Sequence, residues 1–88
     1  MDIQWDGNTK EKFNQMINTK IPVFLRAIAQ VKVSQKAESL AKNDNRSVVS
    51  EKDLVDALFI ETPFGFHGPM KTDMKDLGID YTQYGYEK

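Results

Sequence analysis

Ile21-Pro22-Val23-Phe24-Leu25-Arg26 opens the stretch that decides the fold, and no further Gly or Pro follows before Lys42. Proline is well tolerated in a first helical turn, because its missing N–H would have no partner inside the helix there. The residue before a proline avoids helical dihedral angles, so Ile21 marks a break from whatever precedes it. The sequence therefore predicts a long central helix from about Pro22 to Lys42.

The apolar residues of this predicted helix cover a wide face. One stripe recurs at helical spacing and is widened along one side by three larger residues: Leu25, Ala29, Val33, Ala37, Leu40 and Ala41, with Phe24, Ile28 and Val31. A face much wider than about 100° is typical of a helix covered by partners on two sides. We therefore expect this helix to lie at the centre of the core.

Two shorter helices are expected on either side of it. Phe13, Met16 and Ile17 recur on one helical face and predict a helix over about residues 9–19, with Asn8 or Thr9 as its N-cap. After a turn at residues 43–46 and a short extended segment at Val48-Val49, Ser50-Glu51-Lys52-Asp53 resembles a capping box and predicts a third helix.

The last third of the chain is read as an extension. Thr62 to Pro69 is rich in Gly and Pro and is predicted to be a loop, with a short fourth helix beginning at Pro69. Gly78 followed by Ile79 is typical of a Schellman stop. The tyrosine-rich tail after it either wraps over the helices or contacts a partner.

The expected fold class is all-α: a small orthogonal helical domain with a long central helix between short ones, then a C-terminal loop, short helix and aromatic tail. Residues 1–60 form the domain, and 61–88 are an extension that packs on it or contacts a partner. The predicted core consists of Phe13, Ile17, Leu25, Ile28, Ala29, Val33, Ala37, Leu40, Leu54, Val55, Leu58 and Phe59.

Composition excludes several function classes. The 88 residues contain no cysteine, which excludes disulfides, thiolate metal sites and cysteine nucleophiles. Twelve Lys and Arg against 13 Asp and Glu give a net charge of −1, without the basic excess of a nucleic-acid binder. No apolar run is long enough to span a bilayer, and the first five residues do not resemble a signal peptide. We expect a soluble, cytoplasmic protein.

Groups able to carry out catalysis are few. His67 is the only histidine, and no second His or Cys is present to complete a metal site with it. No phosphate-binding glycine loop is present, and no pair of carboxylates is marked out by its spacing. The sequence therefore predicts a chain that is not an enzyme, with no catalytic residue, metal or cofactor.

The residues expected to contact a partner lie in two segments. Arg26 stands in a first helical turn, where the helix dipole disfavours a cation, so it either pairs with an acidic side chain or reaches an external anion. Met and aromatic residues are adaptable contact groups and are concentrated between Pro63 and Met70. The predicted partner-binding set is Arg26, Phe24, Phe64, Phe66, His67 and Met70.

Trp5, the Ile21-Pro22-x-Phe24-x-Arg26 motif, Val33 and Ala37, with Ser50-Glu51 after a turn, resemble the small proto-chlorophyllide reductase domain over about residues 3–58. In that family the domain ends the B subunit of the nitrogenase-like, light-independent protochlorophyllide reductase and also occurs as small separate proteins. The resemblance implies structural roles for Trp5 and Pro22. It carries over no iron–sulfur or catalytic residue, because those lie outside this domain.

A second pattern is similar to the latter half of a histone fold. It runs from Val33 through Ala37 and Leu40, and then to Arg46 and Asp53. In histones the equivalent Arg and Asp are paired, which implies a structural role for Arg46 and Asp53 and a unit that pairs with itself. The near-neutral charge argues against wrapping DNA.

Together these features favour a non-catalytic accessory or protein-interaction module, a small subunit or partner of a larger protein that is nitrogenase-like or another redox enzyme. Two alternatives stay open: a histone-fold-like protein that dimerises or binds DNA, and a component of protochlorophyllide reduction in chlorophyll biosynthesis. A homodimer is compatible with the first reading, whereas nucleic acid and membrane are not expected partners.

Overall fold

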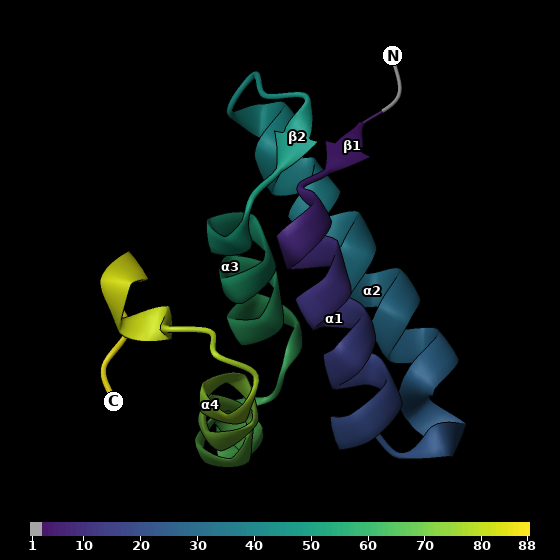
Figure 1. The fold of residues 1–88 in the computed structure, drawn as a ribbon, viewed down its shortest axis with the longest axis vertical. Helices are drawn as coiled ribbons and strands as arrows, with labels where there is room; N and C mark the ends of the chain where they lie inside the picture. Colours follow the sequence, from purple (N-terminus) through teal and green to yellow (C-terminus); the bar gives the residue numbers. More distant parts are fainter. Residues whose placement is uncertain (1–2) are drawn as a thin grey trace.

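The computed structural model describes residues 3–88 and confirms the all-α class. Its elements, in chain order, are β1 (Gln4–Trp5), α1 (Gly7–Lys20), α2 (Val23–Asn43), β2 (Val48–Val49), α3 (Glu51–Glu61), the 3-10 turn η1 (Phe64–Phe66), α4 (His67–Asp76) and the 3-10 turn η2 (Tyr81–Tyr84). The helices α1, α2 and α3 run along the long axis of the molecule, and α4 lies across the lower end of α3 (Figure 1).

The first helix begins earlier than predicted. Asp6, rather than Asn8 or Thr9, is its N-cap: Oδ2 of Asp6 accepts hydrogen bonds from the backbone N–H of Thr9 at 3.1 Å and from its hydroxyl at 3.0 Å. Asp, Asn and Thr all cap helices well, so sequence alone did not separate these neighbours. The helix ends at Lys20, before the predicted break at Ile21.

The long helix α2 agrees with its predicted bounds within one residue, but its coverage differs from the prediction. Val33, Ala37 and Ala41 are buried, whereas Leu25 is 42% exposed and Ile28 60% exposed, so neither belongs to the core. Both α1 and α3 pack against α2, whereas α4 packs mainly against α1, η1 and η2. One of the two expected apolar sides of α2 is therefore left uncovered.

A short parallel bridge joins the N-terminus to the α2–α3 turn. Gln4 pairs with Val48 and Trp5 with Val49, so the predicted extended segment is present as β2. The indole of Trp5 stacks on Phe13 with ring centroids 5.4 Å apart, and its Nε1 donates a hydrogen bond of 3.0 Å to Glu38 on α2. Trp5 thus ties β1 to both α1 and α2.

The predicted stop signals are confirmed in α4. Gly78 has a positive φ of 77°, the N–H of Ile79 donates to the Met74 carbonyl at 2.9 Å, and the N–H of Gly78 donates to Lys75 at 3.1 Å, which is a Schellman motif. The start differs, because α4 begins at His67 rather than at Pro69 and the preceding loop contains η1.

The C-terminal third is part of the same core as the first three helices. Met74, Ile79 and Tyr81 are buried against it. The ring of Tyr86 stacks on Phe59 of α3 at 3.9 Å between centroids, with an interplanar angle of 5°. Across residues 3–88, no helix combines the length and the apolar character needed to cross a membrane.

Candidate interaction surface

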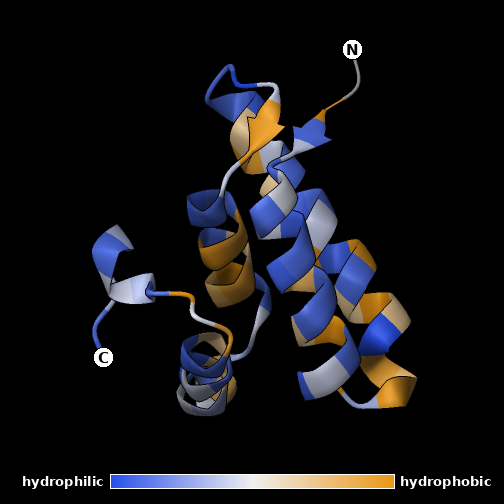
Figure 2. Cartoon of the chain, viewed as in Figure 1, coloured by the Kyte–Doolittle hydropathy of each residue, from blue (hydrophilic) through white to orange (hydrophobic). Residues whose placement is uncertain are grey.

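The uncovered side of α2 carries a row of large apolar side chains. Phe24, Ile28 and Val31, here called the α2 ridge, are 84%, 60% and 53% exposed. Their spacing of four and then three residues puts them on one helical face, away from the buried Val33 and Ala37. Hydrophobic colour is visible on the outer side of the first turns of α2 (Figure 2). A cluster of exposed apolar side chains often marks an interaction surface, whereas single exposed apolar residues are common on any protein.

Beside the ridge lies an apolar groove of about 540 Å³, here called the α2–α4 groove. One wall comes from the α1–α2 corner and α2, and the other from the end of α3, η1 and α4. Its apolar lining consists mainly of Met16, Leu25, Ile28, Leu58, Phe66 and Met70. Ile28 belongs to both the ridge and the groove, and Leu25 lines the groove beside it; both residues were predicted to be core.

The two walls of the groove carry opposite charges. Lys20 and Lys32 line it from α1 and α2, whereas Glu61 and Asp73 line it from α3 and α4. Lys20 also forms a 3.1 Å ion pair with Asp76, which links the end of α1 to the end of α4. A bound chain would therefore meet an apolar floor between a basic and an acidic wall.

Three of the predicted partner-binding residues are exposed at or near this surface. Phe24 belongs to the ridge, Phe66 is 64% exposed and lines the groove, and Phe64 is 88% exposed on η1. Met70 is only 7% exposed, and it lines the groove while belonging to the core cluster. Ile28 and Val31 were not among the predicted partner-binding residues, although they extend the same exposed apolar surface.

Arg26 is held inside the fold rather than directed at solvent. Its Nε donates a 2.9 Å hydrogen bond to the carbonyl of Ile21, and its Nη2 donates one of 2.8 Å to the carbonyl of Asn18. These oxygens belong to the end of α1 and the corner after it, where a cation is favoured by the helix dipole. The hydrogen-bond partners of Arg26 are thus backbone carbonyls, and not the acidic side chain that was one of its two expected partners.

His67 performs a similar role at the end of α3. Its Nε2 lies 2.9 Å from the Thr62 carbonyl oxygen and 3.1 Å from that of Phe59, and because carbonyls only accept, Nε2 carries the proton. The imidazole also meets the ring of Phe59 edge-on, with centroids 5.1 Å apart. His67 therefore fixes the turn from α3 into α4. Its side chain does not itself line the groove.

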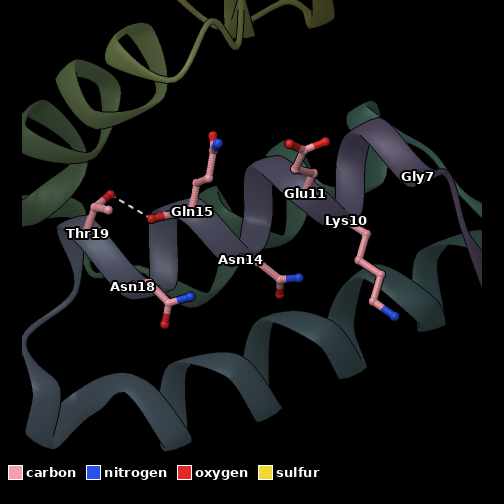
Figure 3. Close-up of a pocket in the computed structure, with 7 residues that line it drawn as sticks. All are labelled: Gly7, Lys10, Glu11, Asn14, Gln15, Asn18 and Thr19. Atoms are coloured by element: carbon pink, nitrogen blue, oxygen red, sulfur yellow. Dashed lines mark hydrogen bonds between the residues drawn. The ribbon is translucent and has the colours of Figure 1, made fainter.

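A second hollow, of about 460 Å³, lies on the polar surface of α1. Lys10, Asn14 and Asn18 point to one side of the helix, whereas Glu11 and Gln15 point to the other (Figure 3). Binding sites for polar ligands need groups that converge, so this hollow is a weaker candidate. Among the side chains of residues 3–88, no group of three or more His, Asp or Glu lies close enough to hold a metal ion.

Comparison with protein families, with curated proteins and with solved structures gives no match to this chain. The groove and the ridge are therefore interpreted from their own geometry and chemistry.

Proposed function

We propose that this chain is a protein-interaction module without catalytic activity of its own, which binds another polypeptide at the α2 ridge and the α2–α4 groove. The observation that carries the proposal is the exposure of Phe24, Ile28 and Val31 on one side of a helix that buries Val33, Ala37 and Ala41 on its other side. Burying such residues is favourable by about 25 cal/mol for each Å² removed from water. A partner would gain that free energy without having to displace any element of this fold.

The polar groups near this surface fit a partner that binds through apolar side chains and carries charged residues at the edges of the contact. Arg26 and His67 donate hydrogen bonds to backbone carbonyls of this fold, so at least these donors serve its two corners. The remaining charges, Lys32 against Glu61 and Asp73, lie on opposite walls of the groove. Such an arrangement fits an amphipathic helix with apolar anchors and flanking charges, which is a common mode of peptide recognition.

A link to nitrogenase-like redox enzymes is a second candidate, favoured by the corner at Ile21-Pro22. Within the motif that resembles the proto-chlorophyllide reductase domain, Arg26 bonds the end of α1 and the corner after it, and Phe24 is left exposed. That is the arrangement expected of a domain docked on a larger subunit. A gene for a nitrogenase-like subunit beside this one would support the link, and its absence would remove this candidate.

Site-specific photo-crosslinking in the native cell tests the interaction proposal. A photoreactive phenylalanine analogue would replace Phe24, Phe66 or, as a control on the polar surface of α1, Gln15. We expect discrete covalent adducts from positions 24 and 66 and none from position 15. If positions 24 and 66 give no adduct, or position 15 gives the same ones, the proposal is wrong.

A further inference from the structure

We infer that the polypeptide bound in the α2–α4 groove is an amphipathic helix that places lysine or arginine side chains against the acidic wall, which carries Glu61 and Asp73. This inference rests on the proposed function and names the chemistry of its partner. Three features of the groove carry it: the charges on its walls that have no partner, the burial of those charges, and the shape of its apolar floor.

The charges of the groove are not balanced between its two walls. Lys20 forms its ion pair with Asp76, which does not line the groove. Among the ion pairs in the described part of the chain, none includes Glu61, Asp73 or Lys32. Among the lining residues that the structure describes, two carboxylates therefore remain against one cation, and the groove favours a partner that brings positive charge.

Burial makes the two carboxylates of the acidic wall more demanding than the lysine opposite. Glu61 and Asp73 are half-buried, whereas Lys32 is exposed and can stay hydrated when the groove is filled. A carboxylate that loses water without gaining a cationic partner costs free energy, because its charge is then neither hydrated nor paired. Helix α3 also ends at Glu61 with no basic residue in its last turn, so the negative end of its dipole adds to this wall. A basic flank on the partner avoids this cost, whereas a wholly apolar or an acidic partner does not.

The apolar floor has the dimensions of a short helix. Along α2 the lining runs from Leu25 to Val33, which is about 12 Å, or two helical turns, at about 1.5 Å per residue. An amphipathic helix fills such a length with apolar anchors spaced four and then three residues apart. Met16 and Met70 also line the floor, and their flexible thioethers adapt to anchors of different shape.

An extended peptide fits this site less well than a helix does. Binding as an added strand needs an exposed sheet edge. The strands β1 and β2 lie at the end of the molecule opposite α4 (Figure 1), and neither contributes a residue to the groove. A helix satisfies its own backbone hydrogen bonds, so it can bind to walls that offer side chains alone.

Three synthetic peptides test the inference by fluorescence anisotropy with the purified chain. Each is a labelled amphipathic helix of about 15 residues with the same leucines at helical spacing. The positions flanking the leucines are all lysine in the first peptide, all glutamine in the second and all glutamate in the third. We expect the lysine peptide to bind about tenfold or more tightly than the glutamate peptide, with the glutamine peptide between them and the difference reduced by salt.

A double variant of the acidic wall shows whether these two carboxylates cause the preference. Glu61→Gln combined with Asp73→Asn keeps the shape of both side chains and should remove most of the preference for lysine. The matched control is Glu11→Gln combined with Glu87→Gln, which removes the same charge at exposed positions outside the groove and should keep the preference. Circular dichroism verifies that both double variants keep their helix content.

The inference is overturned if no peptide binds, if all three bind equally, if the glutamate peptide binds best, or if both double variants lose the preference alike. A species of twice the 10.1 kDa chain mass in sedimentation that no peptide displaces would place a second copy in the groove and overturn it as well. In each of these cases, adducts from positions 24 and 66 in cells would leave the proposed function standing, with a partner of other chemistry. If those adducts are absent too, both fail.

Discussion

The guanidinium of Arg46 forms two parallel hydrogen bonds with the carboxylate of Asp53, each 2.7 Å long. Asp53 is the third residue of α3 and its side chain is only 3% exposed, whereas Arg46 lies in the turn after α2. The same carboxylate accepts hydrogen bonds from the backbone N–H of Ser50 at 2.9 Å and from its hydroxyl at 3.1 Å. One side chain therefore fixes the turn and caps the following helix.

Replacing Asp53 should destabilise the fold strongly, because its carboxylate is buried and accepts hydrogen bonds from both Arg46 and Ser50. Asp53→Ala removes the cap of α3 and leaves the guanidinium without its main partner, so we expect a loss of about 2–3 kcal/mol in the free energy of unfolding. Urea denaturation followed by circular dichroism measures it. Asp44→Ala is the control, because Asp44 also bonds Arg46 but is 71% exposed and should cost about 0.5 kcal/mol or less.

Acidic pH should lower the free energy of unfolding, because it protonates the carboxylate of Asp53. Burial by itself raises the pKa of Asp53, but the hydrogen bonds from Arg46 and Ser50 outweigh it and hold the pKa below its usual value. A lowered folded pKa gives stability that is complete above the unfolded value of about 4 and is lost as the pH falls through the folded one. Asp53→Asn should therefore lose less stability than the wild type between neutral and acidic pH; parallel curves would contradict this.

The elements set by local chemistry could be predicted, and those set by packing could not. Pro22 determines the start of α2, and Gly78 the end of α4, through backbone geometry alone. Whether Ile28 or Val33 faces the core depends on where α1 and α3 settle, and both residues are equally apolar in sequence. The partners of Arg26 were missed because the carbonyls of α1 approach it only after the chain turns at Ile21.

The tyrosines of the tail should ionise late. Burial first, and then hydrogen bonds to Glu51 and Asp56, raise the pKa values of Tyr84 and Tyr86 to about 12 each. A raised folded pKa means that their contribution is complete below about pH 10 and is lost as the pH rises through 12. Absorbance titration should show a late phenolate component that Tyr84→Phe and Tyr86→Phe each reduce. If either variant instead loses absorbance near pH 10 and keeps the late component, the tail does not pack as described.

Two glycines should respond in opposite directions to the same substitution. Gly78 and Gly68 both have free space where a Cβ would be added, with no heavy atom within 4 Å. Gly78 has a positive φ of 77°, so Gly78→Ala should destabilise by about 1 kcal/mol, whereas Gly68 lies within α4 and Gly68→Ala should stabilise by roughly 0.5–1 kcal/mol. Thermal unfolding of the two variants provides the measurement. A destabilised Gly68→Ala would show that α4 does not include this residue.

Arg26 and Phe24 stand two residues apart and should separate stability from binding. Arg26→Ala removes two hydrogen bonds from the end of α1 and should lower the free energy of unfolding by about 1 kcal/mol. Phe24→Ala should change that free energy by less than about 0.5 kcal/mol, because the ring is 84% exposed. Only Phe24→Ala should weaken binding of a partner polypeptide directly, as measured by the yield of adducts crosslinked from position 66. If Phe24→Ala proves the more destabilising of the two, its ring supports the corner itself and the ridge begins at Ile28.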